Sequence, residues 1–240
     1  MSNLQNWSVI LPAHNSEGNI CNTVNELKTY FQTHHLSGQV VVVENGSIDN
    51  TWDVISSIDS SDLPFSLVRT RSEKGLGNAI RKGLESVTTD FVLITADDLP
   101  FGFSDIDGYR KSFSAYEIAI GSKAHPDTDG DRSLSREVMS SVFRTLRRAI
   151  VGVNLGDTQG TIMGKASVIC PISSQTHQSG YLMTTEFLAI ATRAKRSIIE
   201  LPVQYRRESR GSNIKVVGDS VAMLRGLFEV RRQLQIETIK

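Results

Sequence analysis

The stretch FVLITADD, residues 91–98, joins a run of apolar and β-branched residues to two adjacent carboxylates. Such a run is typical of a buried strand, and the following Leu99-Pro100 ends it. Carboxylate oxygens are the ligands that Mg²⁺ and Mn²⁺ prefer in proteins. The stretch therefore predicts a strand with a divalent-cation site at its carboxyl end. The alternative is that Asp97 and Asp98 only cap a helix or a solvated turn.

The first half of the chain repeats an alternation of strand and helix. The four valines at 40–43 are too apolar and too β-branched for anything but a strand buried on both faces. We expect Pro12 to stop the first strand. The alternation favours an α/β fold with a mostly parallel, Rossmann-like sheet covered by helices. Strands are predicted at 9–11, 40–43, 65–68 and 91–95, and helical spacing lies between them at 20–31, 52–58 and 79–84.

Polar, turn-forming segments follow each of these predicted strands, at 12–17, 44–47, 69–77 and 97–98. In a parallel sheet, ligands bind at the carboxyl ends of the strands. We therefore expect the four segments to meet at one edge and to form a nucleotide-type site. Backbone N–H groups at the helix start Gly75-Leu76-Gly77 could face an anion there.

The second half of the chain is less regular. Its expected elements are strands at 116–120 and 197–202, an arginine-rich helix at 135–151, a polar turn at 157–160, and helices at 185–194 and 216–234. Segment 125–131 is expected to be a mobile loop. No repeat or clear linker interrupts the chain, so we expect a single domain over residues 1–240, with an irregular C-terminal half.

Composition excludes several classes of protein. The 240 residues carry 26 basic and 26 acidic side chains, so the chain has no field suited to nucleic acid. Its two cysteines lie far apart and lack metal spacing, which argues against a zinc site or a disulfide framework. The first seven residues are polar, and no apolar run reaches 18 residues, so we expect no signal peptide and no transmembrane segment.

The motifs, in their order, resemble glycosyltransferase family 2, which has the GT-A fold. The similarity covers nearly the whole chain and is greatest to the dolichyl-phosphate glucosyl- and mannosyltransferases and their bacterial polyprenyl-phosphate relatives. It rests on LPAHN (11–15), VENGS (43–47), KGLGNA (74–79), ADDL (96–99), GSK (121–123), SLSR (133–136), DTQ (157–159), ELPV (200–203) and GSNIK (211–215).

The chain departs from the family pattern at several positions. His14 stands where the family has an aromatic residue, and Glu44-Asn45 replaces paired aspartates. Ala96 takes the first position of the D-A-D motif, Asp97 the middle one, and Asp98 keeps the last, which usually binds the metal. Because neighbouring strand residues point to opposite faces, Asp97 is less well placed for the cation than Asp98. The identity of the donor is therefore open.

The resemblance implies an inverting hexosyltransferase that uses a UDP- or GDP-hexose as donor and a polyprenyl or dolichyl phosphate as acceptor, with Mg²⁺ or Mn²⁺. Residues 1–100 would form the nucleotide-binding half and 101–240 the acceptor-binding half. A cytoplasmic location is expected, with peripheral contact on the inner face of the membrane left open. The apolar side of 216–234 would either pack on its own domain or lie on an anionic membrane.

The resemblance also assigns site residues. The catalytic group would be Asp97, Asp98 and Arg136, with Asp98 as the metal ligand. The nucleotide would lie against Pro12, His14, Val43, Asn45, Gly75, Leu76 and Asp97. The acceptor phosphate would meet Lys123, Arg132 and Arg136, since guanidinium groups bind phosphate with paired hydrogen bonds, and Asp157 and Gln159 would frame the acceptor site. For the arginines, a solvated helix face is the alternative.

Two other functions compete with this one. A family 2 transferase acting on a glycan or a small hydroxyl acceptor would need a carboxylate base, for which Asp157 or an acid of 127–131 is a candidate. A non-catalytic nucleotide-sugar-binding protein would be compatible with the altered D-A-D and D-D motifs. Hydrolysis of the donor in the presence of metal would separate the second alternative from either enzyme.

Overall fold

A computed structural model of the chain describes residues 6–128, 134–204, 206 and 216–237, with side chains for all of these except 134–139, 216–222 and 237. The strands are β1 (Asn6–Ala13), β2 (Ser37–Glu44), β3 (Ser66–Arg71), β4 (Phe91–Ile94), β5 (Ile118–Ser122), β6 (Ile162–Lys165) and β7 (Ile198–Pro202). The helices are α1 (Ile20–Thr33), α2 (Thr51–Ser57), α3 (Leu76–Leu84), α4 (Ser104–Ser112), α5 (Leu134–Val151), α6 (Ala166–Ser173), α7 (Leu182–Arg193) and α8 (Val216–Glu237).

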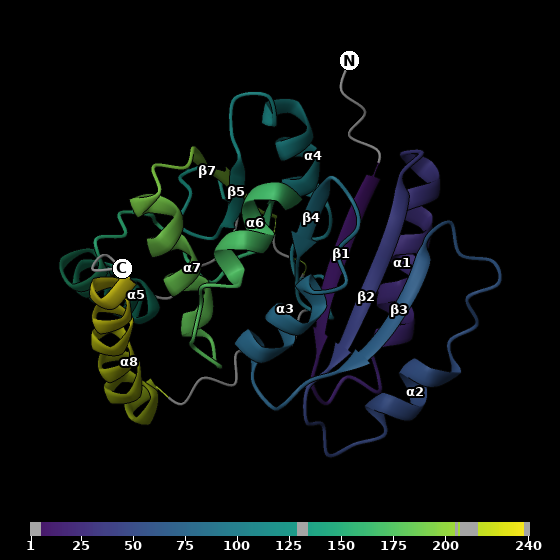
Figure 1. Ribbon diagram of the computed structural model, residues 1–240, viewed down its shortest axis with the longest axis horizontal. Helices are drawn as coiled ribbons and strands as arrows, with labels where there is room; N and C mark the ends of the chain where they lie inside the picture. Colours follow the sequence, from purple (N-terminus) through teal and green to yellow (C-terminus); the bar gives the residue numbers. More distant parts are fainter. Residues whose placement is uncertain (1–5, 129–133, 205, 207–215, 238–240) are drawn as a thin grey trace.

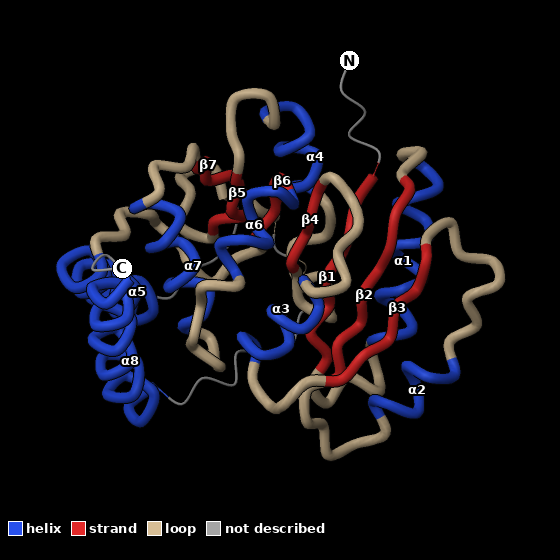
Figure 2. The backbone as a smooth tube through the Cα atoms, in the orientation of Figure 1, coloured by secondary structure: helices blue, strands red, loops and turns tan. Residues whose placement is uncertain are grey.

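The described strands form one sheet in the order β3-β2-β1-β4-β6-β5-β7 (Figures 1 and 2). The neighbours β3, β2, β1 and β4 are parallel, and β5 is parallel to β7. Only β6 among these strands runs against its neighbours β4 and β5. The predicted mostly parallel sheet is confirmed. The carboxyl ends of its parallel strands lie at one edge.

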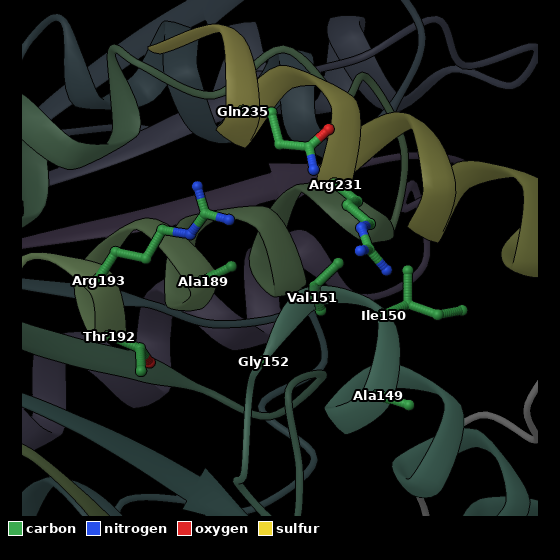
Figure 3. A pocket seen from close by; sticks show the side chains of 9 residues that line it. All are labelled: Ala149, Ile150, Val151, Gly152, Ala189, Thr192, Arg193, Arg231 and Gln235. Atoms are coloured by element: carbon green, nitrogen blue, oxygen red, sulfur yellow. The ribbon is translucent and has the colours of Figure 1, made fainter. Parts of the chain in front are cut away.

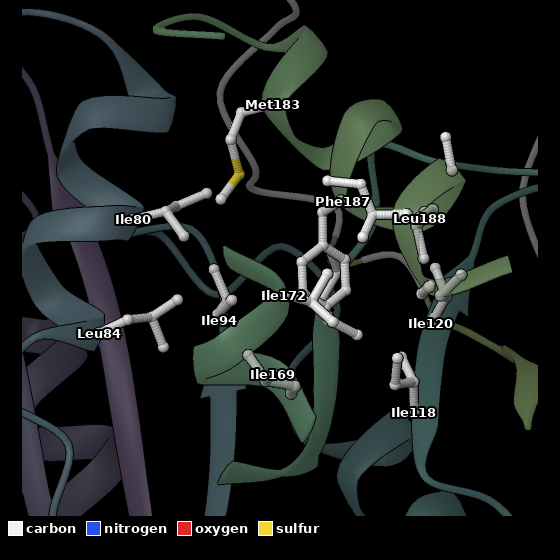
Figure 4. Close-up of a cluster of buried hydrophobic side chains, with 14 of the residues drawn as sticks. Ile80, Leu84, Ile94, Ile118, Ile120, Ile169, Ile172, Met183, Phe187 and Leu188 are labelled. Atoms are coloured by element: carbon white, nitrogen blue, oxygen red, sulfur yellow. The ribbon is translucent and has the colours of Figure 1, made fainter. Parts of the chain in front are cut away.

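Helices cover both faces of the sheet, and β2 shows why. Val40 and Val42 pack against α1 and α2, whereas Val41 and Val43 pack against α3, because successive side chains point to opposite faces. All four valines are completely buried, as predicted. Figure 4 shows the hydrophobic core on the α3 face of the sheet, where Ile80 of α3, Ile172 of α6 and Phe187 of α7 meet the sheet.

The first strand is longer than predicted. β1 runs through Pro12, which pairs with Val43 of β2. The ladder between β1 and β4 ends at Ile10, so beyond that point β1 has a strand neighbour on one side only. A proline, which lacks an N–H donor, is tolerated where one side needs no ladder bond.

Three elements were not predicted: α4, β6 and α6. α4 holds a buried acid, Asp105, which is 1% exposed. Its Oδ1 accepts a hydrogen bond from the Ile106 N–H at 2.9 Å, and Thr161 Oγ1 donates to its Oδ2. Burial raises the pKa of Asp105 from 3.8 to about 6 despite these hydrogen bonds.

This buried acid should make stability depend on pH. Since the pKa of Asp105 is higher in the folded state than in the unfolded state, the contribution of this group to stability is fully present below its unfolded pKa of 3.8 and is lost as the pH rises through 6. The rise in pKa from 3.8 to about 6 corresponds to roughly 3 kcal/mol of unfolding free energy. Urea unfolding of Asp105→Asn and the parent chain between pH 4 and 7.5 measures it. The difference between them should change by that amount over this range, and a constant difference would contradict it.

Candidate active site

The ends of β1, β2 and β3 are tied together at the carboxyl edge of the sheet. The Asn15 N–H donates to Ser47 Oγ at 3.1 Å, and the Ile48 N–H donates to Asn15 Oδ1 at 3.0 Å. The Ser72 N–H donates to the Glu44 carbonyl at 2.9 Å. The expectation that the polar segments after these strands meet at one edge is therefore confirmed.

The turn after β4 presents Asp98 at this same edge. Leu99 adopts a left-handed φ of 44° and is 1% exposed, so its side chain anchors the turn in the core while its backbone is strained. The Leu99 N–H closes the turn onto the Ala96 carbonyl at 3.2 Å, and Thr23 Oγ1 donates to the Asp97 carbonyl. Asp98 is half-buried, and among the described residues its carboxylate has no hydrogen bond or ion pair. It is available to a ligand.

The buried polar atoms that lack a hydrogen-bond partner at this edge, within the described part of the chain, include two on residues predicted to contact the nucleotide. They are Oδ1 of Asn45, at the end of β2, and Nδ1 of His14, just after β1. Asn45 is 4% exposed, and its backbone N–H donates to the Ala13 carbonyl. Buried polar atoms without partners are costly, and in native proteins they indicate an absent ligand or water. These atoms fit the donor and acceptor groups of a nucleoside.

The unpredicted strand β6 brings the turn at 157–160 to the same edge. Ile162 pairs with both Ile94 of β4 and Ile120 of β5. The residues just before Ile162 therefore lie level with the ends of those two strands. The Gly121 N–H donates to the Thr161 carbonyl at 2.9 Å and fixes this alignment. Asp157 and Lys123 are thus neighbours. The family resemblance assigns both residues to the acceptor side.

Asp157 is the centre of a polar network. Its Oδ1 accepts from the Gln159 N–H at 2.8 Å, and its Oδ2 accepts from the Lys123 N–H at 3.1 Å and lies 3.8 Å from Lys123 Nζ. Glu200 of β7 accepts from the N–H groups of Gly156 and Asp157 at 2.8 and 3.0 Å, and from Ser122 Oγ at 2.6 Å. The side-chain amide of Gln159 donates to the Tyr181 carbonyl at 3.1 Å. The turn is held rigidly.

The start of α3 is less open than predicted. The N–H groups of Gly77 and Asn78 donate to the Ser179 carbonyl at 2.7 and 3.3 Å, so the expectation that Gly77 faces an anion is wrong. Gly75 itself has φ 129° and lies against Ser179, which explains the glycine. That Gly75 and Leu76 contact a nucleotide stays a prediction, now without an open helix N-terminus.

Other predicted residues lie in the core or outside the described side chains. Pro12 is buried, and Val43 is 0% exposed against α3, so only its backbone remains for a ligand. Arg132 lies outside the described residues, and of Arg136 only the backbone in α5 is described. Arg206, beyond β7, donates from its N–H to the Pro100 carbonyl at 3.0 Å and pairs with Glu26.

Sequence reasoning missed three charged residues that hold the site: Arg147 and Glu186, which are buried, and Glu200, which is partly buried. Glu186, 1% exposed on α7, accepts from the N–H groups of His177 and Gln178 at 2.8 Å each, and so holds the segment whose Ser179 carbonyl caps α3. A lone acid in the otherwise apolar stretch 186–191 was the available signal. Arg147 could not be told apart from the other arginines of its helix. Glu200 had been assigned only to the motif ELPV in a predicted strand.

The described side chains at this edge could bind a cation only if a bound substrate supplied further ligands. No cluster of three or more His, Cys, Asp or Glu side chains exists among the described residues. Mg²⁺ is commonly held by one or two carboxylates plus substrate phosphates. The unpaired carboxylate of Asp98 matches that arrangement, in which a diphosphate supplies the remaining ligands.

A cavity of about 480 Å³ lies elsewhere, where the C-terminal ends of α5 and α7 meet α8 (Figure 3). Thr192 lines it, about 14 Å along α7 from Met183, which contacts the start of α3. Arg193, Arg231 and Gln235 also line the cavity, and no carboxylate does. With two arginines and no carboxylate among its described lining residues, it is poorly suited to a cation, and we place the candidate active site at the sheet edge.

The chain belongs to glycosyltransferase family 2: the family model "Glycosyl transferase family 2" matches residues 8–166. It is thus a glycosyltransferase with a GT-A fold. It is 27% identical to the dolichyl-phosphate β-glucosyltransferase of Saccharomyces cerevisiae, over 93% of this chain and 73% of that one. It is 33% identical to the dolichol-phosphate mannosyltransferase of Pyrococcus furiosus, over 62% of this chain and 48% of that one.

Solved structures agree on the fold. Glucosyl-3-phosphoglycerate synthase from Mycobacterium tuberculosis, in complex with Mn²⁺, UDP and phosphoglyceric acid, superimposes with a TM-score of 0.66 at 17% identity, over 95% of this chain and 77% of that one. Mannosyl-3-phosphoglycerate synthase from Rubrobacter xylanophilus gives a TM-score of 0.67 at 16% identity, over 99% and 76%.

Proposed function

We propose that this chain transfers one hexose, with inversion, from a UDP- or GDP-hexose to a polyprenyl or dolichyl phosphate, using Mg²⁺ or Mn²⁺. The observation that carries the proposal is the Asp98 carboxylate, unpaired among the described residues, at the same sheet edge as the unbonded polar atoms of Asn45 and His14. The dolichyl-phosphate enzymes among its relatives support the acceptor, and the Mn²⁺ and UDP in the neighbouring structure support the cofactor and one of the two donors.

The proposed roles follow from where each residue lies at the carboxyl edge of the sheet. Asp98 would hold the cation, which when bound neutralises the charge that develops on the departing nucleoside diphosphate. Asn45 and His14 would contact the nucleoside, with the backbone at Pro12, Val43 and Gly75-Leu76 around it. Asp97 would lie at the ribose. This division leaves the residues 1–100 as the nucleotide-binding half.

The acceptor side would be built from residues 101–240. Lys123, Arg132 and Arg136 would bind the acceptor phosphate, and Asp157 with Gln159 would frame it. A phosphate monoester has its second pKa at about 6, so the attacking oxygen is already ionised near neutral pH. Such an acceptor needs no strong general base in the protein.

The network around Asp157 favours this acceptor over a hydroxyl group. Both oxygens of Asp157 already accept hydrogen bonds, from the N–H groups of Gln159 and Lys123, so this carboxylate is committed to holding the turn and only its remaining lone pairs could take a proton. The second candidate base was an acid of 127–131; of these acids, Asp127 has a described side chain, and it is exposed. A non-catalytic binding protein was the third candidate, and the family match together with the glycosyltransferases among the relatives argues against it.

The reaction is tested by incubating the purified chain with Mn²⁺, radiolabelled UDP-glucose or GDP-mannose, and a short polyprenyl phosphate. We expect label to enter the organic phase as a glycosyl phosphate, with inverted anomeric configuration by NMR. Polyprenol, which has the same tail and a hydroxyl head, should accept no label. Transfer to polyprenol or to sugars instead would favour the hydroxyl-acceptor alternative, and nucleotide binding without any transfer would favour the binding protein.

We also propose that the paired helices α5 and α8 touch the membrane. Leu227, Val230 and Leu234 of α8 are buried in the core, so most of its apolar side packs on its own domain. Other apolar side chains stay outside: Val142 of α5 is 56% exposed and Phe228 of α8 is 54% exposed. Exposed arginines accompany them on α8, at positions 225, 231 and 232. None of the described helices is long and apolar enough to span a bilayer.

The double variant Val142→Asp, Phe228→Asp should bind anionic vesicles about tenfold or more weakly, because it removes apolar area and adds repulsion. Vesicle sedimentation with 30% phosphatidylserine at low and high salt measures this. Ile48→Asp is the matched control, since Ile48 is 91% exposed in the loop after β2, away from both helices. Equal binding by all three proteins would exclude these helices as the contact.

A further inference from the structure

The arginines of α5 do not share one environment. Arg148 is exposed, as a solvated helix face would predict, but the neighbouring Arg147 is 2% exposed. A long charged side chain is almost never buried unless it is paired. Arg147 is therefore held inside the domain for a reason that its exposed neighbours do not share.

The guanidinium of Arg147 reaches the turn that carries Asp157. Its Nη1 donates to Thr158 Oγ1 at 3.0 Å, and its Nη2 donates to the Leu155 carbonyl. Thr158, 1% exposed, is also hydrogen-bonded through Oγ1 to Thr185 Oγ1 of α7 at 2.9 Å. One side chain thus links α5, the turn and α7 at a single buried point.

The charges around Arg147 explain how it is tolerated. Burial lowers the pKa of its guanidinium, and the negative charges of Asp157 and Glu200 oppose that effect. Lys123 pairs with the same Asp157. Two cations and two anions therefore share the site, although Arg147 Nε is buried without a partner among the described residues. Replacing a buried charge by an apolar side chain of similar size is often neutral or stabilising, so what distinguishes Arg147 is the geometry of its hydrogen bonds.

We propose that Arg147 is a positioning residue, which holds the turn 155–159 through Thr158 and so sets the geometry of the acceptor side of the active site. The proposal rests on the proposed function, in which Asp157 and Gln159 frame the acceptor. Arg147 itself need not touch the substrate. Removing its two hydrogen bonds would release the turn from α5 while Glu200 still holds its other side.

The test compares Arg147→Met, Arg147→Lys and Thr158→Val with the control Arg148→Met, which removes the same charge from the next, exposed position. Hydrogen exchange of the backbone amides at 156–159 is measured first, because it needs no activity. We expect exchange about tenfold faster in Arg147→Met and Thr158→Val, with partial recovery in Arg147→Lys and no change in Arg148→Met. Unchanged protection in the two former variants would overturn the proposal.

Steady-state kinetics with a detergent-dispersed short polyprenyl phosphate gives the second measurement. We expect the acceptor KM to rise on the order of tenfold in Arg147→Met and Thr158→Val, with the donor KM within about twofold of the parent. Equal changes for donor and acceptor would assign Arg147 a merely structural role and overturn the proposal. If Arg147→Met does not fold, Thr158→Val carries the same comparison.

The two hypotheses fail in different ways. If the parent chain transfers no hexose to the polyprenyl phosphate, the proposed function fails, and the exchange data still decide whether Arg147 holds the turn. If the parent is active and exchange at 156–159 is unaltered in the variants, the proposed function stands and the role of Arg147 does not.

Discussion

Replacing Asp98 with alanine is expected to lower the rate of hexose transfer by about 10³-fold, since a preorganised charge that acts on the leaving group is worth this much. Asp98 is half-buried and has no partner among the described residues, so its loss should cost little folding stability. The Mn²⁺-dependent rise in the melting temperature with UDP or GDP should disappear as well, because ligand binding stabilises the folded state by mass action.

The matched control for this variant is Asp90→Ala. Asp90 is exposed and lies just before β4, at the opposite end of the strand from Asp98. Its replacement should leave both transfer and the metal-dependent melting shift unchanged. Asp98→Asn keeps the size of the side chain and removes its charge, and should be nearly as inactive as the alanine variant. Transfer by Asp98→Ala at close to the parent rate would show that another group holds the cation.

Replacing Gly160 with alanine is expected to lower the free energy of unfolding by about 3 kcal/mol or more. A Cβ at Gly160 would overlap the carbonyl oxygen of Gly121, which is backbone and cannot turn aside. The clash would separate β5 from the start of β6, where the Gly121 N–H bonds to the Thr161 carbonyl. Lys123 and Asp157 would then lose their alignment, so acceptor affinity should fall too. Urea unfolding measures the stability.

Gly180→Ala is the control for that substitution. A Cβ at Gly180 would meet no atom within 4 Å, so its replacement should change the unfolding free energy by less than about 0.5 kcal/mol. Similar stability of the two variants would mean that the sheet edge yields at Gly121, contrary to the packing described above.

The first half of the fold was predictable because its signals are local. A run such as Val40–Val43 can only be a strand buried on both faces, and regular alternation with helices implies a parallel sheet. The second half was harder for a physical reason. β6 has four residues, between a polar turn and α6, and its place between β4 and β5 is set by pairing with distant strands rather than by its own pattern.

The candidate site was predictable in part. Asp98, Asn45 and His14 follow recognisable strands, so their meeting at one edge could be expected from topology. Glu186 left a signal, as a lone acid in an apolar stretch, but Arg147 and Glu200 could not be recognised, since a sequence does not show which charged residue of a helix or strand points inward. The capping of α3 by Ser179 joins segments about 100 residues apart, and no local pattern announces such a contact.

The central claim is that the nucleotide sugar binds at the carboxyl edge of the sheet, at Asp98. Paramagnetic broadening by Mn²⁺ locates the cation most directly: amide spectra of the labelled chain are recorded with UDP or GDP and substoichiometric Mn²⁺, and again with Mg²⁺. The account predicts the strongest broadening at Asp98, Asn45 and the residues around them, and much less at Arg193 and Arg231. Broadening centred on the cavity between α5, α7 and α8, or spread evenly over exposed acids, would contradict it.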